Sequence, residues 1–266
     1  MSEQRPKVTL EQADGVARVW LDRPEVHNAF DDELIRALQE AIAAAAHDPE
    51  VRVIVLGGRG KSFSAGADLS WMKRSAVWTD EENAADARGL AGLFRSLRDA
   101  PKVTVARVHG TAMGGGLGLI AACDLAFALE TVKFSFSEVR LGLIPAVISP
   151  HVIDKIGPAR ARELFVTAAR FDAAQAERMG LITRAVPDEA ALDAAVAEAI
   201  AQVRAAGPHA VAAAKALVRQ VTTLPPGEVD AYTAAQIAAR RASSEGQEGL
   251  RAFLEKRPPA WAPSED

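Results

Sequence analysis

Two kinds of apolar pattern alternate along the first 160 residues. Short continuous runs rich in valine, isoleucine and leucine predict buried strands, and they cover residues 8–10, 16–21, 51–56, 102–108, 124–128 and 133–136. Between them, apolar residues spaced three or four apart predict helices that begin after Asp31, at Asp80 and at Gly114. The glycines at 57, 58 and 60 are expected to end the third strand.

The order of these elements predicts the fold class. Residues 13–15 separate the first two strands with Ala-Asp-Gly, which indicates a hairpin. Strands then alternate with helices, which is typical of an α/β core. From about Pro158 onward the chain is mostly helical and rich in alanine.

Composition narrows the class of protein. The 266 residues are 49% hydrophobic and carry a net charge of −4, which argues against a nucleic-acid-binding surface. The single cysteine, Cys123, excludes an internal disulfide and a multi-cysteine metal site, and no histidines have metal-ligand spacing. We expect a cytoplasmic protein, because the first residues are polar and no apolar run reaches the roughly 20 residues of a membrane helix.

Two glycine-marked turns carry the candidate chemistry. The first is Ser-Phe-Ser-Ala-Gly-Ala-Asp-Leu at residues 62–69, and the second includes the glycine triplet at 114–116, between a strand and a helix. Backbone amides at such turns can donate to an oxygen that gains negative charge during a reaction. Nucleotide-binding loops fail on spacing, since Val55 and Leu119 stand where glycines are required. We interpret Asp68 as a structural cap of nearby amides.

Glu138 is the candidate acid. It follows a predicted strand and precedes an Ile-Pro turn, and its neighbours Val139, Leu141 and Leu143 are apolar. An apolar environment disfavours the charged carboxylate, raises its pKa and makes proton exchange easier near neutral pH.

These pieces, in this order, resemble the crotonase superfamily, the enoyl-CoA hydratase/isomerase family. The resemblance covers nearly the whole chain and rests on residues 23–24, 28–29, 64–69, 114–116, 123–124, 138–145 and 252–257. It implies an α/β fold with a crotonase-like ββα spiral core and an α-helical C-terminal trimerisation region. Residues 1–200 would form the acyl-CoA-binding catalytic core and residues 201–266 the oligomerisation region.

The same resemblance implies roles for particular residues. The amides of Ala67 and Gly115 would form the oxyanion hole, and Glu138 would transfer protons. The residues that would bind coenzyme A or the substrate are Glu25, Val26, His27, Asn28, Ala65, Gly66, Ala67, Asp68, Leu69, Met113, Gly114, Gly115, Phe253 and Lys256. Coenzyme A would enter as part of the substrate, and no metal or separate cofactor is implied. The expected partners are the acyl-CoA thioester and further copies of the chain, in a homotrimer or a hexamer.

The resemblance leaves the reaction open, because Gly118 stands where hydratases of the family usually carry a second glutamate. One hypothesis is hydration of a 2-enoyl-CoA by Glu138 alone. Within it, the sequence around 141–150 resembles bacterial methylglutaconyl-CoA and isohexenylglutaconyl-CoA hydratases of leucine and terpene breakdown, with Arg140 or Lys73 as candidates for a second substrate carboxylate. The alternatives are a Δ3-Δ2 enoyl-CoA isomerase with one base, and an acyl-CoA-binding or RNA-binding relative with little catalysis.

Overall fold

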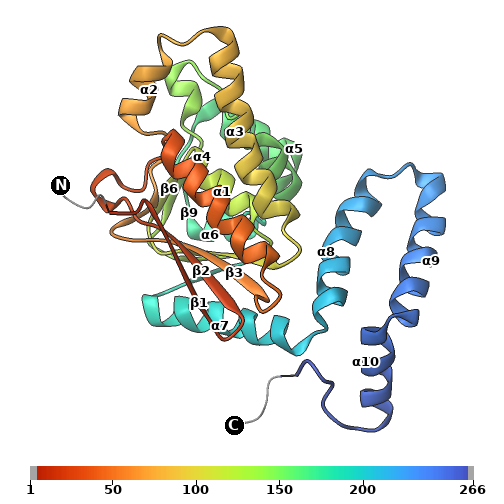
Figure 1. Cartoon of the computed structure of the whole chain (residues 1–266). Helices are drawn as coiled ribbons and strands as arrows, with labels where there is room; N and C mark the ends of the chain where they lie inside the picture. The colour runs from red at the N-terminus through yellow and green to blue at the C-terminus, as the bar shows by residue number, and fades with distance from the viewer. Residues whose placement is uncertain (1–4, 263–266) are drawn as a thin grey trace.

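The computed structural model describes residues 5–262 and contains two β-sheets in its core (Figure 1). The larger sheet has the order β1-β2-β3-β5-β7-β10, with bounds Val8–Ala13, Val16–Leu21, Val53–Gly58, Val103–Val108, Leu125–Leu129 and Arg184–Val186. The smaller sheet has the order β4-β6-β8-β9, with bounds Ser62–Ser64, Thr111–Met113, Lys133–Ser135 and Phe171–Asp172. The pairs β1–β2 and β8–β9 are antiparallel, and all other neighbouring strands are parallel.

From β3 to β8, successive strands enter the larger and the smaller sheet alternately. In each of the pairs β3–β4, β5–β6 and β7–β8, the first strand joins the larger sheet and the second joins the smaller one, and helices follow. This repeated ββα order confirms the predicted α/β fold and its spiral core. Every residue of β3 is buried, which explains why its sequence is continuously apolar instead of alternating.

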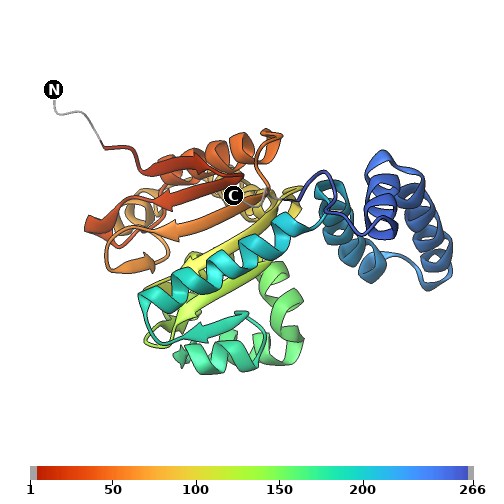
Figure 2. The ribbon, with the colours of Figure 1, turned by 90° about the horizontal axis from the view of Figure 1, so that it is seen from below.

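Helices cover both faces of the larger sheet. Their bounds are α1 Asp32–His47, α2 Leu69–Ser75, α3 Asp80–Asp99, α4 Gly115–Ala122, α5 Ser149–Thr167, α6 Ala173–Arg178, α7 Glu189–Ala205, α8 Pro208–Thr223, α9 Pro226–Ala242 and α10 Ser244–Leu254. Two short 3-10 helices are η1, Pro24–Val26, and η2, Glu138–Leu141. Helix α1 packs on β1, β2 and β3 and contacts α3, whereas α7 lies across β5 and β7 (Figure 2).

The start of α1 agrees with the sequence. The side chain of Asp31 accepts a hydrogen bond from the Leu34 amide at 2.8 Å, as expected for an N-cap. The apolar positions of this helix, Leu34, Ile35, Leu38, Ile42 and Ala45, are all buried.

The expected end of β3 is wrong. The strand does not stop at the glycines but continues through Gly57 and Gly58, which pair with Trp20 and Leu21 of β2. The glycine at 57 has a packing reason, because a Cβ atom there would lie 2.4 Å from Cζ3 of Trp20. The sequence suggested that Gly57 ends the strand. In the structure, position 57 is a glycine because the indole ring of Trp20 occupies the space that a side chain would need.

Helices α8, α9 and α10 extend away from the core as an arm (Figures 1 and 2). Helix α8 is joined to the core by Lys215, whose ammonium lies 2.7 Å from a carboxylate oxygen of Asp124 and 3.0 Å from the Lys102 carbonyl oxygen. Helix α7 runs through residue 200 and the arm begins with α8, so the division of the chain into two functional regions stays a prediction. Among residues 5–262, no helix is both long and apolar enough to cross a membrane.

Candidate active site

The first turn, residues 65–68, follows β4 and is held by backbone hydrogen bonds to residues 27–30. The Phe30 amide donates to Gly66 O at 2.6 Å, the Asp68 amide donates to Phe30 O at 2.8 Å, and the Ala65 amide donates to His27 O at 2.9 Å. Gly66 has a φ of +87°, a conformation that glycine adopts without strain. Within the described residues, the Ala67 amide donates no hydrogen bond to the protein, and Ala67 is exposed.

The second turn joins β6 to α4. Gly114 is the N-cap residue of α4 with a φ of +48°, and its amide donates to Ser135 O at 3.1 Å. The next residue, Gly115, is the first of the helix, where an amide has no intrahelical acceptor. Its N–H has no acceptor among the described residues, so it remains available at the positive end of the helix dipole.

The two turns and the predicted acid come together in space. A Cβ atom on Gly66 would lie 3.1 Å from Met113 O, so the first turn lies against the second. A Cβ atom on Gly114 would lie 3.2 Å from Oε1 of Glu138, so the acid lies directly against the second turn. Parallel pairing of β4 with β6 and of β6 with β8 produces this arrangement, since each site segment follows one of these strands.

Glu138 occupies the first position of η2 and is only half exposed. Its Oε2 is buried and has no hydrogen-bond partner among the described residues. Burial disfavours the charged form and raises the pKa of Glu138 above its ordinary value of 4.5, against a smaller lowering by a hydrogen bond from its own backbone amide. A carboxylate with one unpartnered oxygen and a raised pKa is suited to taking and returning a proton.

Asp68 is the cap that the sequence predicts. Its carboxylate accepts hydrogen bonds from the amides of Ser70 at 2.7 Å and Trp71 at 3.2 Å, at the start of α2. Burial alone would raise the pKa of Asp68, but these two amides and the nearby Arg23 together lower it. The group is therefore a charged structural anchor for the first turn and not a second proton carrier.

The sequence did not reveal the role of Arg23 in the site. Its guanidinium lies 3.1 Å from carboxylate oxygens of both Asp31 and Asp68 and donates to Ala29 O at 2.7 Å. Arg23 therefore connects Asp31, the N-cap residue of α1, with Asp68, the N-cap residue of α2. The only signal in the sequence was its place before Pro24, which gives no hint of the two carboxylates.

The predicted coenzyme A segment, residues 25–28, lies beside the first turn. His27 and Asn28 both have a φ near +55°, so the chain bends sharply there. The Asn28 side chain is fully buried and donates to Arg59 O and Ser62 O, so it shapes the bend from inside. Glu25 and His27 are exposed and remain available to a ligand.

Four predicted residues make no hydrogen bond to either turn within the described part of the chain: Phe253, Lys256, Arg140 and Lys73. Helix α10, the last helix of the arm, lies away from α4 (Figure 1). It contains Phe253, which is 81% exposed, and Lys256 follows it in the chain. Arg140 donates from its guanidinium to Ala168 O at 3.2 Å, and Lys73 is exposed on α2. Among the described residues, no hydrogen bond or ion pair joins either side chain to Glu138.

Cys123 and Asp124 are structural residues of the core. Burial raises the pKa of the Cys123 thiol to about 12, which makes it unreactive at neutral pH. Asp124 accepts hydrogen bonds from both the amide and the hydroxyl of Thr104.

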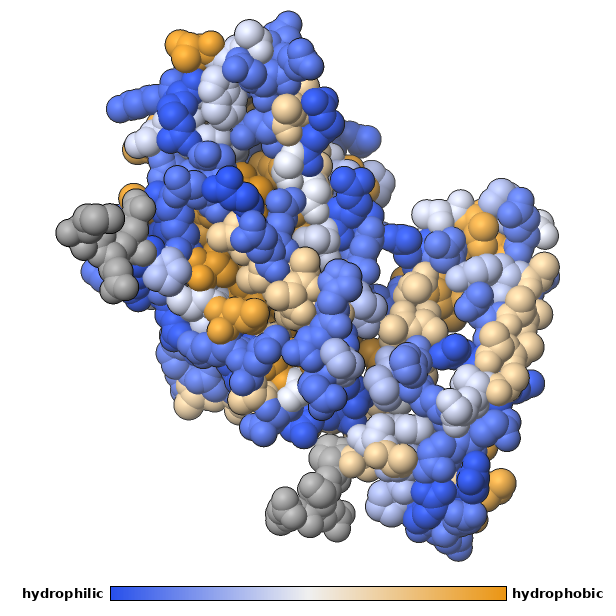
Figure 3. Space-filling model, in the orientation of Figure 1, coloured by the Kyte–Doolittle hydropathy of each residue, from blue (hydrophilic) through white to orange (hydrophobic). Residues whose placement is uncertain are grey.

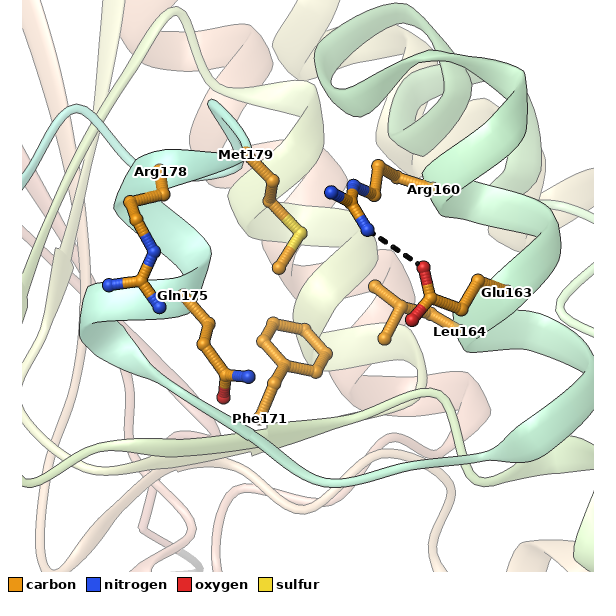
Figure 4. Close-up of a pocket in the computed structure, with 7 residues that line it drawn as sticks. All are labelled: Arg160, Glu163, Leu164, Phe171, Gln175, Arg178 and Met179. Atoms are coloured by element: carbon orange, nitrogen blue, oxygen red, sulfur yellow. Dashed lines mark hydrogen bonds and ion pairs between the residues drawn. The ribbon is translucent and has the colours of Figure 1, made fainter.

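A cavity of about 390 Å³ lies elsewhere, between α5 and α6 (Figure 4). It is lined by Arg160, Glu163, Leu164, Phe171, Gln175, Arg178 and Met179. Its acid, Glu163, is paired with Arg160 at 3.0 Å, and none of the predicted site residues lines it. The cavity therefore does not coincide with the candidate active site.

The fold and the paired turns define the class of crotonase-like α/β proteins, and comparisons with known proteins agree. The family model described as enoyl-CoA hydratase/isomerase matches residues 11–264. A crystal structure of an enoyl-CoA hydratase from Shewanella pealeana is 40% identical, with a TM-score of 0.92 and 96% of each chain covered. The Pseudomonas aeruginosa protein AtuE is 36% identical, with a TM-score of 0.93, and the match covers 97% of this chain and 100% of that one. A crotonyl-CoA hydratase of Syntrophomonas wolfei is 32% identical over 70% of this chain and 71% of its own.

The chain belongs to the enoyl-CoA hydratase/isomerase family and is an enzyme of that family.

Proposed function

We propose that the protein hydrates 2-enoyl-CoA thioesters, with Glu138 as the sole proton carrier and the amides of Ala67 and Gly115 as the oxyanion donors. The observation that carries the proposal is the contact between Glu138 and the Gly114 turn, beside two amides with no acceptor among the described residues. The names of relatives support hydration, since they include a crotonyl-CoA hydratase.

Hydration needs only Glu138, the amides of Ala67 and Gly115, and one water molecule. The Glu138 carboxylate takes a proton from water as the water oxygen bonds to C3 of the substrate. The electron pair of the C2–C3 double bond moves toward the thioester, whose oxygen gains negative charge and is stabilised by the two amides. Protonated Glu138 then returns its proton to C2, which restores the carboxylate and gives the 3-hydroxyacyl thioester.

The second candidate is Δ3-Δ2 isomerisation, which the absence of a side chain at Gly118 favours. One base that removes a proton at C2 and returns it at C4 suffices for this reaction. A branched glutaconyl-CoA remains the finer hypothesis for the substrate and rests on sequence resemblance alone. Arg140 gives it no added support, because its guanidinium donates to the Ala168 carbonyl oxygen.

The test is turnover in H₂¹⁸O with crotonyl-CoA, 3-methylglutaconyl-CoA and a 3-enoyl-CoA, followed by mass spectrometry. We expect ¹⁸O at C3 of the product from a 2-enoyl substrate, and the substrate with the highest kcat/KM would identify the acyl class. Migration of the double bond without ¹⁸O would replace hydration by isomerisation. Binding of acyl-CoA with no turnover of any of the three would reject both reactions.

We further propose that the arm joins copies of the chain in a homotrimer or a dimer of trimers. Apolar patches are visible on the arm (Figure 3), and Phe253 and Leu254 are 81% and 78% exposed. Apolar side chains this exposed are suited to a protein interface. Such an assembly would allow Phe253 and Lys256 of one copy to reach the coenzyme A bound by another.

Light scattering tests the assembly. We expect a mass of three or six times the 28.2 kDa of the chain, and a lower mass for the Phe253→Glu/Leu254→Glu variant. A monomeric wild-type protein at micromolar concentration would contradict the proposal.

A further inference from the structure

Phe30 lies in the short segment between η1 and α1, and its backbone holds the first turn from both sides. Its amide donates to Gly66 O at 2.6 Å, and its carbonyl oxygen accepts from the Asp68 amide at 2.8 Å. Between these two hydrogen bonds lies Ala67, with which Phe30 forms an isolated parallel bridge. The Ala67 amide, one of the two proposed oxyanion donors, is therefore fixed relative to the backbone of Phe30.

The side chain of Phe30 reaches the second turn. A Cβ atom on Gly115 would lie 2.5 Å from Cε2 and 2.8 Å from Cδ2 of the Phe30 ring. Phe30 is only 1% exposed, so its ring has no free space into which it could move. Gly115 carries the other proposed donor and does not have a positive φ. The ring, and not the backbone conformation, is therefore what excludes a side chain at position 115.

Ser64 makes a second contact between the same two turns. A Cβ atom on Gly116 would lie 3.0 Å from Cβ of Ser64, which is fully buried. The Ser64 hydroxyl donates to Asn28 O at 2.9 Å and accepts from the Gly66 amide at 3.3 Å. The turns are thus packed against each other at two points. If the ring of Phe30 is shortened, the contact at Ser64 remains, so we expect a small displacement of the second turn and not its collapse.

We propose that Phe30 is a positioning residue that sets the separation between the amides of Ala67 and Gly115, with its backbone on one and its ring on the other. This inference rests on the proposed oxyanion role of the two amides and adds the residue that keeps them at a fixed spacing. Two donors stabilise one oxygen only when both lie within hydrogen-bond distance of it. The size of the Phe30 side chain therefore affects the reaction without any contact with the substrate.

The first test is Phe30→Leu, which keeps both backbone hydrogen bonds and removes the Cε2 atom that meets Gly115. We expect kcat for the preferred enoyl-CoA to fall by about 10–100-fold, because a displacement of 1 Å can lower a rate by about 10²-fold. The dissociation constant of butyryl-CoA, measured by calorimetry, should change much less. Charge on the thioester oxygen grows in the transition state, so misplaced donors reduce kcat more than ground-state binding.

An infrared measurement reports on the donors directly. The probe is butyryl-CoA labelled with ¹³C at the thioester carbonyl, bound to each variant. Hydrogen bonds to the oxygen weaken the C=O bond, so the wild-type band should lie below the frequency of the same thioester in an aprotic solvent. In Phe30→Leu the band should move to higher frequency, a change that a loss of stability alone does not produce.

Phe127→Leu is the matched control. Phe127 is also a buried phenylalanine, 3% exposed, but it lies on β7 of the larger sheet, with the guanidinium of Arg184 5.6 Å from its ring centroid. Both substitutions should lower the midpoint of urea unfolding. Only Phe30→Leu should change kcat and the carbonyl band.

A size exchange tests the contact itself. Gly115→Ala should lower kcat by about 10²-fold, because the new methyl group meets the Phe30 ring and displaces the amide. Phe30→Leu in the same chain makes space for this methyl group and should raise kcat above that of Gly115→Ala by about tenfold. If the two losses multiplied in the double variant instead, the residues would not share one space and the positioning role would be overturned.

The outcomes separate this inference from the proposed function. An unchanged kcat and an unchanged band in folded Phe30→Leu would overturn the positioning role and leave hydration untouched. A lowered wild-type band without turnover of any enoyl-CoA would reject hydration, and the band of Phe30→Leu would still decide the role of Phe30. A wild-type band at the frequency of the aprotic solvent would reject the oxyanion site and, with it, both proposals.

Discussion

Glu138→Gln is expected to reduce kcat of the preferred enoyl-CoA by about 10²–10⁴-fold, the usual contribution of a positioned acid–base group. Glutamine keeps the size and most contacts of the side chain but cannot take a proton from water. The dissociation constant of a saturated acyl-CoA should stay within a factor of two or three, about the scatter of such comparisons. Stopped-flow or steady-state absorbance at the enoyl thioester band measures the first quantity, and calorimetry measures the second.

The raised pKa of Glu138 predicts how the activity and the stability of the wild-type protein depend on pH. In wild type, kcat/KM should fall as the pH decreases through a pKa above 4.5, because the protonated acid cannot accept a proton. The folded state binds a proton at Glu138 more tightly than the unfolded chain does. Stability from this group is therefore present at low pH and is lost as the pH rises from about 4.5 through the raised value. Glu138→Gln should lose the acid limb of activity and raise Tm near neutral pH.

Glu40→Gln is the control for these measurements, because Glu40 is an exposed glutamate of α1. It should change neither kcat, nor the pH profile, nor Tm. If Glu138→Gln retained wild-type turnover on the best substrate found, another group would have to transfer the proton. An unchanged acid limb in a partly active variant would lead to the same conclusion.

Arg23→Met is expected to have the second largest effect. The substitution leaves the buried carboxylates of Asp31 and Asp68 without a shared cation, and breaking such a buried pair typically costs about 3–5 kcal/mol. We expect a loss of about 3 kcal/mol, the low end, since Asp31 keeps Lys7 and Asp68 keeps two backbone amides. The first turn should also loosen, and a displacement of catalytic groups by 1 Å can lower the rate by about 10²-fold.

Urea unfolding and steady-state kinetics check these two expectations. A fall in kcat with a smaller change in KM would indicate a misplaced oxyanion amide and not a lost binding contact. Arg160→Met is the matched control, because the pair of Arg160 with Glu163 is 65% and 58% exposed. Exposed pairs contribute about 0–1 kcal/mol, so this variant should be close to wild type. Equal effects of the two arginine substitutions would contradict the anchoring role of Arg23.

Local sequence signals predicted five of the six strands of the larger sheet, but only β8 of the smaller sheet. The Asp31 cap, the helix from Asp80 and the apolar strands depend on residues close together in the chain, and their patterns are strong. The end of β3 was missed because it depends on Trp20 of a neighbouring strand, whose ring takes the place of a side chain at Gly57. No local pattern distinguishes a glycine that breaks a strand from one that admits a ring.

By itself, the sequence determined the order of β1, β2, β3, β5, β7 and β8 and of the helices α1, α3 and α4, the two glycine turns, the candidate acid and the absence of a side chain at Gly118. These are properties of residue type and short spacing. The short strands β4, β6, β9 and β10 were not predicted. Tertiary structure alone decided that Gly66 meets Met113, that Glu138 lies against Gly114, and that Arg23 joins two caps. It also decided that Ile148 and Phe94 fill the space at Gly118. The physical reason is that these contacts depend on the pairing of strands distant in sequence and on the volumes of side chains that close packing brings together.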